Sequence, residues 1–62
     1  MMRAVFFDKE RATYTAVENV VQLNGVTDKY NGKYTNLWRM YLDNGNTIDL
    51  PQKWYSVHRI DV

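Results

Sequence analysis

The chain has 62 residues, with eight Lys and Arg against seven Asp and Glu, one His and no Cys. This length accommodates one domain, residues 1–62. The formal net charge is only +1, whereas many domains that bind nucleic acid carry a clear excess of basic residues. The lack of cysteine excludes disulfides and thiolate metal sites, and a single histidine argues against zinc. We therefore expect neither a metal nor a cofactor.

The small size also limits how much core the chain can build. A chain of about 60 residues buries only about 60% of the surface that its unfolded form exposes. Self-association is one way to gain stability, so a homodimer is one expectation. The first apolar run, Ala4–Phe7, is too short for a signal peptide or a membrane span, and the charged tetrad Asp8–Arg11 ends it. We expect a cytoplasmic protein without a membrane segment.

Valine and aromatic residues dominate the apolar composition, with seven Val, five Tyr, two Trp and two Phe. These residues favour the half-buried surface of a strand. Turn signals recur at short spacing, at Asp8–Arg11, Asn24-Gly25, Asn31-Gly32, Asn44-Gly45 and Pro51. The pattern predicts an all-β domain, with four or five antiparallel strands curled into a small barrel or a two-layer sheet.

The tetrad Asp8–Arg11 separates two expected strands, residues 2–7 and 12–23. A four-residue loop sets Phe7 opposite Ala12. The side chains that then share one face are those of Val5, Phe7 and Tyr14.

In the second of these strands apolar and polar residues do not alternate regularly. In a regular strand Val17 and Val21 would point to one face and Val20 to the other. A β-bulge near Glu18-Asn19 would move the side chains of the later residues to the opposite faces of the sheet. A one-turn helix is the alternative, since the three valines also fit helical spacing. The β-branched run favours the bulge.

Residues 24–36 form the most polar stretch of the sequence. Taken as a single connection this stretch is long for a compact domain, and long loops are often functional. Val26 and Tyr34 would shorten the connection if they extend the flanking strands.

The segment Leu37–Leu50 alternates apolar and polar residues on both sides of a turn signal. A two-residue Asn44-Gly45 turn would set Met40 opposite Asp49 and mix apolar with charged side chains on each face. A three-residue loop, with Gly45 left-handed in a bulge, separates them. We therefore predict the pairs Trp38 with Leu50, Met40 with Ile48, Arg39 with Asp49 and Tyr41 with Thr47.

Pro51 is expected to end that strand because it lacks a backbone donor. A 3₁₀ turn over residues 52–55 would direct Trp54 and Val57 inward. A final strand over residues 57–62 would place Ile60 and Val62 on one face.

Three short segments of the C-terminal half form a sequence pattern: Asp43-Asn44-Gly45, then Ile48-Asp49-Leu50-Pro51, then Tyr55-x-Val57-x-x-Ile60. This pattern, over less than a third of the chain, resembles small β-proteins of phages and prophages in low-GC bacteria. The resemblance implies a short antiparallel sheet or an SH3-like barrel. It implies no activity and carries over no functional residue.

Ser56, His58 and Asp61 lie close in sequence, as the members of a catalytic triad sometimes do. On one short strand Ser56 and His58 stand side by side, while Asp61 points to the other face unless a bulge intervenes, so the three cannot easily converge on a substrate. The glycines are isolated turn residues and form no phosphate-binding loop. We expect no catalytic residues and no enzyme activity.

Aromatic and basic residues together suggest a binding surface. Trp38 and Trp54 are expected in the core. The polar stretch contributes the candidates Lys29, Tyr30, Lys33 and Tyr34, and the outward face of the 37–50 hairpin contributes Arg39 and Tyr41. Tyr and Arg are enriched at the centres of protein interfaces, and aromatic platforms in basic grooves bind single-stranded nucleic acid.

The sequence therefore predicts a small non-enzymatic module that binds a protein partner, as an accessory or inhibitory factor of a mobile element. A single-stranded nucleic-acid-binding β-barrel is the alternative.

Overall fold

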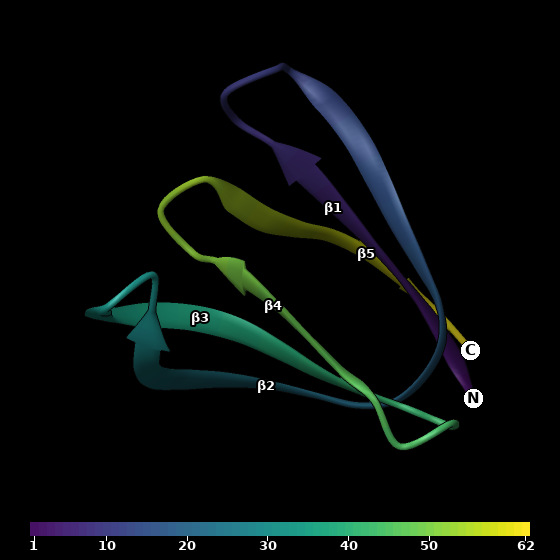
Figure 1. Cartoon of the computed structure of the whole chain (residues 1–62). Coiled ribbons are helices and arrows are strands. Elements are labelled where there is room, and N and C mark those ends of the chain that lie inside the picture. Colours follow the sequence, from purple (N-terminus) through teal and green to yellow (C-terminus); the bar gives the residue numbers. More distant parts are fainter.

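A computed structural model of the chain describes all 62 residues and contains five strands, β1 (Met2–Asp8), β2 (Thr13–Tyr30), β3 (Lys33–Leu42), β4 (Thr47–Pro51) and β5 (Tyr55–Asp61). They form one antiparallel sheet in the order β4-β3-β2-β1-β5 (Figure 1). The predicted small antiparallel all-β class is confirmed. The chain has no helix and therefore none that could cross a membrane.

The sheet curls until its two edge strands, β4 and β5, approach each other, but they do not pair (Figure 1). A side chain bridges the two sides at one point: the Trp38 indole N–H on β3 donates to the Tyr55 carbonyl on β5 over 2.9 Å. The sheet is thus open and is not a closed barrel.

The long strand β2 serves two hairpins, because its first part pairs with β1 and its second part with β3. The β1 register shifts between Met2 and Ala4, opposite Asn19, which has a left-handed φ of 59°. This confirms the predicted bulge at Glu18-Asn19. A second shift, between Val20 and Gln22 in the pairing with β3, follows at once. Bulges bend a strand, so β2 turns here from one side of the sheet to the other.

The predicted register of the first hairpin is wrong by two residues, because Phe7 pairs with Tyr14 and not with Ala12. β1 continues to Asp8, so the four-residue loop starts one position later than expected. The Asp8 carboxylate stabilises this loop by accepting the N–H groups of Glu10 and Arg11 over 3.0 and 3.1 Å. The Phe7 and Tyr14 rings do share a face, with centroids 5.4 Å apart.

The prediction of a long connection over residues 24–36 is wrong, and the alternative that Val26 and Tyr34 extend the flanking strands is confirmed. β2 and β3 run through this stretch, and only Asn31 and Gly32 remain as a turn. Their φ angles of 53° and 82° are those of a type I′ hairpin turn. The hairpin is polar because its tip extends beyond the core.

The β3–β4 hairpin has the predicted register, including the pairs Trp38–Leu50 and Met40–Ile48. The Gly45 N–H donates to the Leu42 carbonyl over 3.0 Å, and Gly45 has a φ of 87°. The predicted three-residue loop with a left-handed glycine is confirmed.

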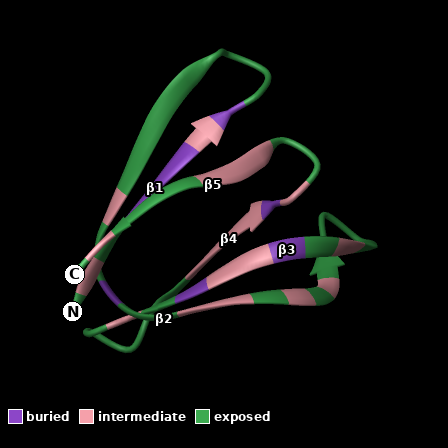
Figure 2. Cartoon of the chain, turned by 180° about the vertical axis from the view of Figure 1, so that it is seen from behind, coloured by how far each residue is buried: buried purple, intermediate pink, exposed green.

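The core lies inside the curl of the sheet and is small, as Figure 2 shows by the short buried stretches. Four fully buried side chains form its centre: Ala4, Phe6, Val20 and Met40. Partly buried side chains surround them, namely Met2, Val17, Leu23, Trp38, Leu42, Ile48, Leu50, Tyr55 and Val57.

The prediction for Trp54 is wrong, because its side chain is 42% exposed while Trp38 packs against the core. Residues 52–54 form a turn in which the Trp54 N–H donates to the Pro51 carbonyl over 3.1 Å. This turn brings Val57 inward but leaves Trp54 at its outer side. Ile60 and Val62, predicted to share a face, are both exposed.

Candidate binding groove

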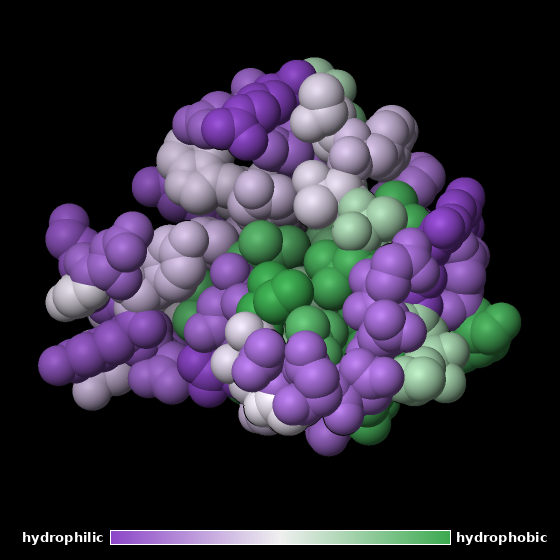
Figure 3. Space-filling model, turned by 45° about the vertical axis from the view of Figure 1, so that its right-hand side comes forward, coloured by the Kyte–Doolittle hydropathy of each residue, from purple (hydrophilic) through white to green (hydrophobic).

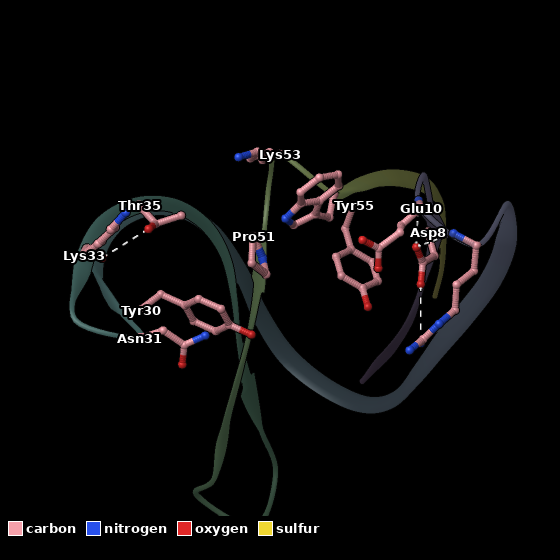
Figure 4. Close-up of a pocket in the computed structure, with 11 residues that line it drawn as sticks. Asp8, Glu10, Tyr30, Asn31, Lys33, Thr35, Pro51, Lys53 and Tyr55 are labelled. Carbon is pink, nitrogen blue, oxygen red and sulfur yellow. Dashed lines mark hydrogen bonds and ion pairs between the residues drawn. The ribbon is translucent and has the colours of Figure 1, made fainter.

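The largest hollow of the molecule is an open groove of about 520 Å³ at the end where three chain turns meet (Figure 4). One side comes from the β1–β2 loop, a second from the tip of the β2–β3 hairpin, and the third from the β4–β5 connection. The lining residues are Asp8, Glu10, Arg11, Tyr30, Asn31, Lys33, Thr35, Pro51, Lys53, Trp54 and Tyr55.

Backbone hydrogen bonds hold the β4–β5 connection against both hairpins. The Lys9 N–H donates to the Trp54 carbonyl over 2.8 Å, which joins the connection to the β1–β2 loop. The Gln52 N–H donates to the Asn36 carbonyl over 2.9 Å. The Gln52 side-chain amide donates to the Leu37 carbonyl over 3.1 Å, so the connection is also joined to β3. The three sides of the groove are therefore positioned relative to one another.

The aromatic residues of the groove come from two of its sides. Trp54 is 42% exposed, and the Lys53 ammonium lies 5.0 Å from its ring centroid. In Figure 4 the Tyr30 ring lies beside Pro51, and the Tyr55 phenol extends on the side of Asp8 and Glu10. An exposed indole that lines the same hollow as two tyrosine rings offers a surface onto which an apolar or planar group can pack.

The charges of the groove are mixed and divided between its sides. Asp8 and Glu10 belong to the β1–β2 loop, together with Arg11, whose guanidinium lies 3.8 Å from the Asp8 carboxylate. Lys33 and Lys53 belong to the other two sides. Asp8 is nearly buried and serves the loop, so Glu10 is the anionic group on this side that remains available to a ligand.

The six predicted binding residues do not form one site. Tyr30 and Lys33 line the groove. Lys29 and Tyr34 pair across the same hairpin outside it, with the Lys29 ammonium 5.7 Å from the Tyr34 ring centroid.

Arg39 and the neighbouring Tyr41 lie on β3 and do not line the groove. The Arg39 guanidinium donates to both carboxylate oxygens of Asp49, over 2.9 and 3.0 Å, and to Asp28 over 3.1 Å. The hydrogen bonds with Asp49 and then Asp28 raise the pKa of Arg39 above its usual value. Because two carboxylates already neutralise it, this arginine is a poor anchor for a ligand.

A bulge is present at His58, and it puts Ser56 and Asp61 on the same face of the sheet, because they pair with Phe7 and Arg3 of β1. The expectation that Asp61 points to the other face is therefore wrong, but the contacts of the side chains are separate. The His58 ring packs on the Tyr14 ring, with centroids 4.7 Å apart. Asp61 instead pairs with Arg59 over 2.9 Å. No group of three or more His, Asp and Glu side chains lies close enough together to hold a metal ion.

The sequence prediction missed most of the groove, above all Trp54, Lys53 and Glu10. These residues lie in turns, where a side chain lacks a strand face that would bury it. The signal for Trp54 was its position just after Pro51, because the turn that follows a strand end projects side chains into solvent.

No protein-family model, curated protein or solved structure matches the chain. The resemblance to small phage β-proteins therefore stays a prediction.

Proposed function

We propose that the chain is a non-enzymatic protein-binding module that holds an extended segment of its partner in the groove. The observation that carries this proposal is the exposed Trp54, set in a hollow with Tyr30, Tyr55 and charges of both signs. A volume of about 520 Å³ lies within the range of ligand sites in proteins and has room for a few side chains. Tryptophan and tyrosine are the residues that most often dominate binding energy at protein interfaces.

The mixed charge supports a polypeptide over a polyanion. Glu10 faces the same hollow as Arg11, Lys33 and Lys53. A phosphate backbone would meet repulsion from the Glu10 carboxylate, whereas a peptide offers groups of both signs. A partner segment with a basic residue near Glu10 and an acidic residue near Lys33 complements both sides.

The wider setting belongs to the same proposal. The resemblance to phage-type β-proteins supports an accessory or inhibitory role for a mobile element in the cytoplasm. The strand order and the curl that brings β4 toward β5 support the description of the sheet as an SH3-like barrel that stops short of closure.

Selection of peptides from a random display library, followed by backbone amide shift mapping, tests the proposal. Bound peptides are expected to shift the amides of residues 8–11, 30–35 and 52–55. Trp54→Ala should weaken binding roughly 10- to 30-fold, as the loss of a central aromatic anchor does. Tyr34→Ala is the matched control, because Tyr34 is 73% exposed and lies outside the groove. Peptides that shift other residues, or that bind Trp54→Ala unchanged, would contradict the proposal.

One observation favours the nucleic-acid alternative. Two lysines stack on exposed rings, Lys29 on Tyr34 and Lys53 on Trp54. If these pairs bind single strands, labelled oligo-dT and oligo-U should bind at about 50 mM salt and weaken steeply by about 200 mM. Absence of binding at the lower salt removes this alternative.

A further inference from the structure

The C-terminal part of β5 is an unpaired sheet edge. At the start of the strand the Tyr55 carbonyl accepts a hydrogen bond from the Trp38 indole, but further along the strand residues 58–60 are exposed. The opposite edge, β4, ends in Pro51, which cannot donate to a further strand. β5 contains no proline, so it is the edge that another strand can extend.

A bulge limits where such a strand can pair. The register between β1 and β5 shifts between Val5 and Phe6, which leaves His58 as the extra residue. Bulges interrupt pairing and protect edges. The regular part of the free edge is therefore the short run Arg59–Asp61.

Apolar side chains gather at the same end of the molecule. A hollow of about 310 Å³ is lined only by apolar residues, namely Met1, Met2, Val20, Val21 and Val62. Ile60, on the neighbouring edge, is 39% exposed. Figure 3 shows that apolar surface also reaches solvent at the centre of its view, among hydrophilic residues.

The outer face of the sheet carries a row of alternating charges toward this edge. The Arg3 guanidinium contacts Glu18 over 2.7 Å and Asp61 over 4.0 Å. Asp61 in turn contacts Arg59 over 2.9 Å. The row ends at the edge with one acid and one base that are two positions apart on β5.

This arrangement is self-complementary. In an antiparallel pair of β5 strands related by a two-fold axis at Ile60, each Arg59 lies opposite the Asp61 of the other copy, and the two Ile60 side chains meet. A two-fold axis at Arg59 would oppose two cations. An axis at His58 would oppose Val57 with Arg59. Of these registers, only the one centred on Ile60 places opposite charges across from each other and apolar side chains across from each other.

We propose that the chain forms a two-fold symmetric homodimer in which the β5 edges pair at Arg59–Asp61 and the two Ile60 side chains meet on the axis. The pairing extends the five-stranded sheet across both copies. The groove lined by Trp54 lies at the other end of the molecule, so each copy keeps its groove accessible.

Sedimentation equilibrium of the full chain tests the dimer. The wild type is expected at twice the chain mass of 7.4 kDa at about 0.5 mM and to dissociate on dilution. Arg59→Glu places anions opposite each other and should raise the dissociation constant at least about tenfold. Ile60→Lys places two cations on the axis and should do the same. Lys33→Glu is the matched charge-reversal control, because Lys33 lies in the groove.

Amide spectra of each variant show whether its monomer is folded, so that loss of the dimer is separated from unfolding. Wild-type hydrogen exchange should show protection of residues 59–61 that increases with protein concentration. A monomer at every concentration, or a dimer that both edge variants leave unchanged, overturns the proposal. Peptide binding by the monomeric Arg59→Glu variant tests the groove independently.

Discussion

Among single residues, Asp8 connects the fold most directly to the groove. It ends β1, its side chain is nearly buried, and its carboxylate accepts two backbone N–H groups of the loop that forms one side of the groove. The same loop carries Glu10 and Arg11, so the position of both charges depends on Asp8.

Asp8→Ala should lower the free energy of unfolding by about 1–3 kcal/mol, because two loop donors lose their acceptor. Asp8→Asn keeps a carbonyl oxygen at Oδ1 and should lose less. Urea denaturation of the three proteins checks this order. Equal stability of Asp8→Ala and the wild type would show that the loop does not need the carboxylate.

Asp28 makes stability depend on pH. The Lys29 backbone N–H, and then Arg39, stabilise its carboxylate and lower its pKa below the ordinary value of 3.8. Its contribution to stability is therefore fully present above pH 3.8 and is lost as the pH falls through the lower folded pKa. Asp28→Asn should show a smaller loss of thermal stability than the wild type between about pH 5 and pH 2. Identical acid profiles would contradict this assignment.

At the scale of elements, the three hairpins differ in how far the sequence determines them. The β3–β4 register follows from the sequence because only one loop length keeps Met40 and Trp38 opposite apolar partners. The β1–β2 register does not, because Val5 and Phe7 lie on one face and Ala4 and Phe6 on the other, and either face can serve as the core. The β2–β3 hairpin extends past the core, so its residues show no apolar alternation, and only Asn31-Gly32 indicates it.

The left-handed glycine of the β3–β4 loop gives a test of this hairpin. Nothing lies within 4 Å of the position that a Gly45 Cβ would occupy, so Gly45→Ala adds no clash and only the strain of its φ of 87°. We expect a loss of about 1 kcal/mol in unfolding free energy. Gly25→Ala provides a contrast, because there the new Cβ would lie 3.1 Å from the Gln52 amide nitrogen without a left-handed φ. Urea denaturation that leaves Gly45→Ala as stable as the wild type would contradict the loop geometry.

At the scale of the whole molecule, the groove could not be predicted because it depends on how the sheet curls. The polar, turn-rich surroundings of Tyr30 and Lys33 do indicate these two residues as binding residues. Their neighbours Glu10 and Trp54 lie about twenty residues away along the chain in either direction. Local periodicity carries no information about such a meeting of turns, which follows from the bulges that bend β2.

One side-chain hydrogen bond spans the open side of the curled sheet. The Trp38 N–H donates to the Tyr55 carbonyl and joins β3 to β5 across the open side of the sheet. Trp38→Phe keeps an aromatic ring but loses this donor and leaves a half-buried carbonyl unpaired, so we expect a loss of about 1–3 kcal/mol in unfolding free energy. Hydrogen exchange should accelerate at the start of β5 more than in the β2–β3 hairpin.

Trp54→Phe is the matched control, because the Trp54 side chain is exposed. This substitution also removes an indole N–H, but that N–H makes no hydrogen bond within the fold. This variant should retain wild-type stability and the wild-type exchange pattern. If Trp38→Phe were as stable as Trp54→Phe, the Trp38–Tyr55 hydrogen bond would not be needed to hold the curl. The position of the β4–β5 connection, and with it the groove, would then depend on the Lys9–Trp54 and Gln52–Asn36 backbone bonds.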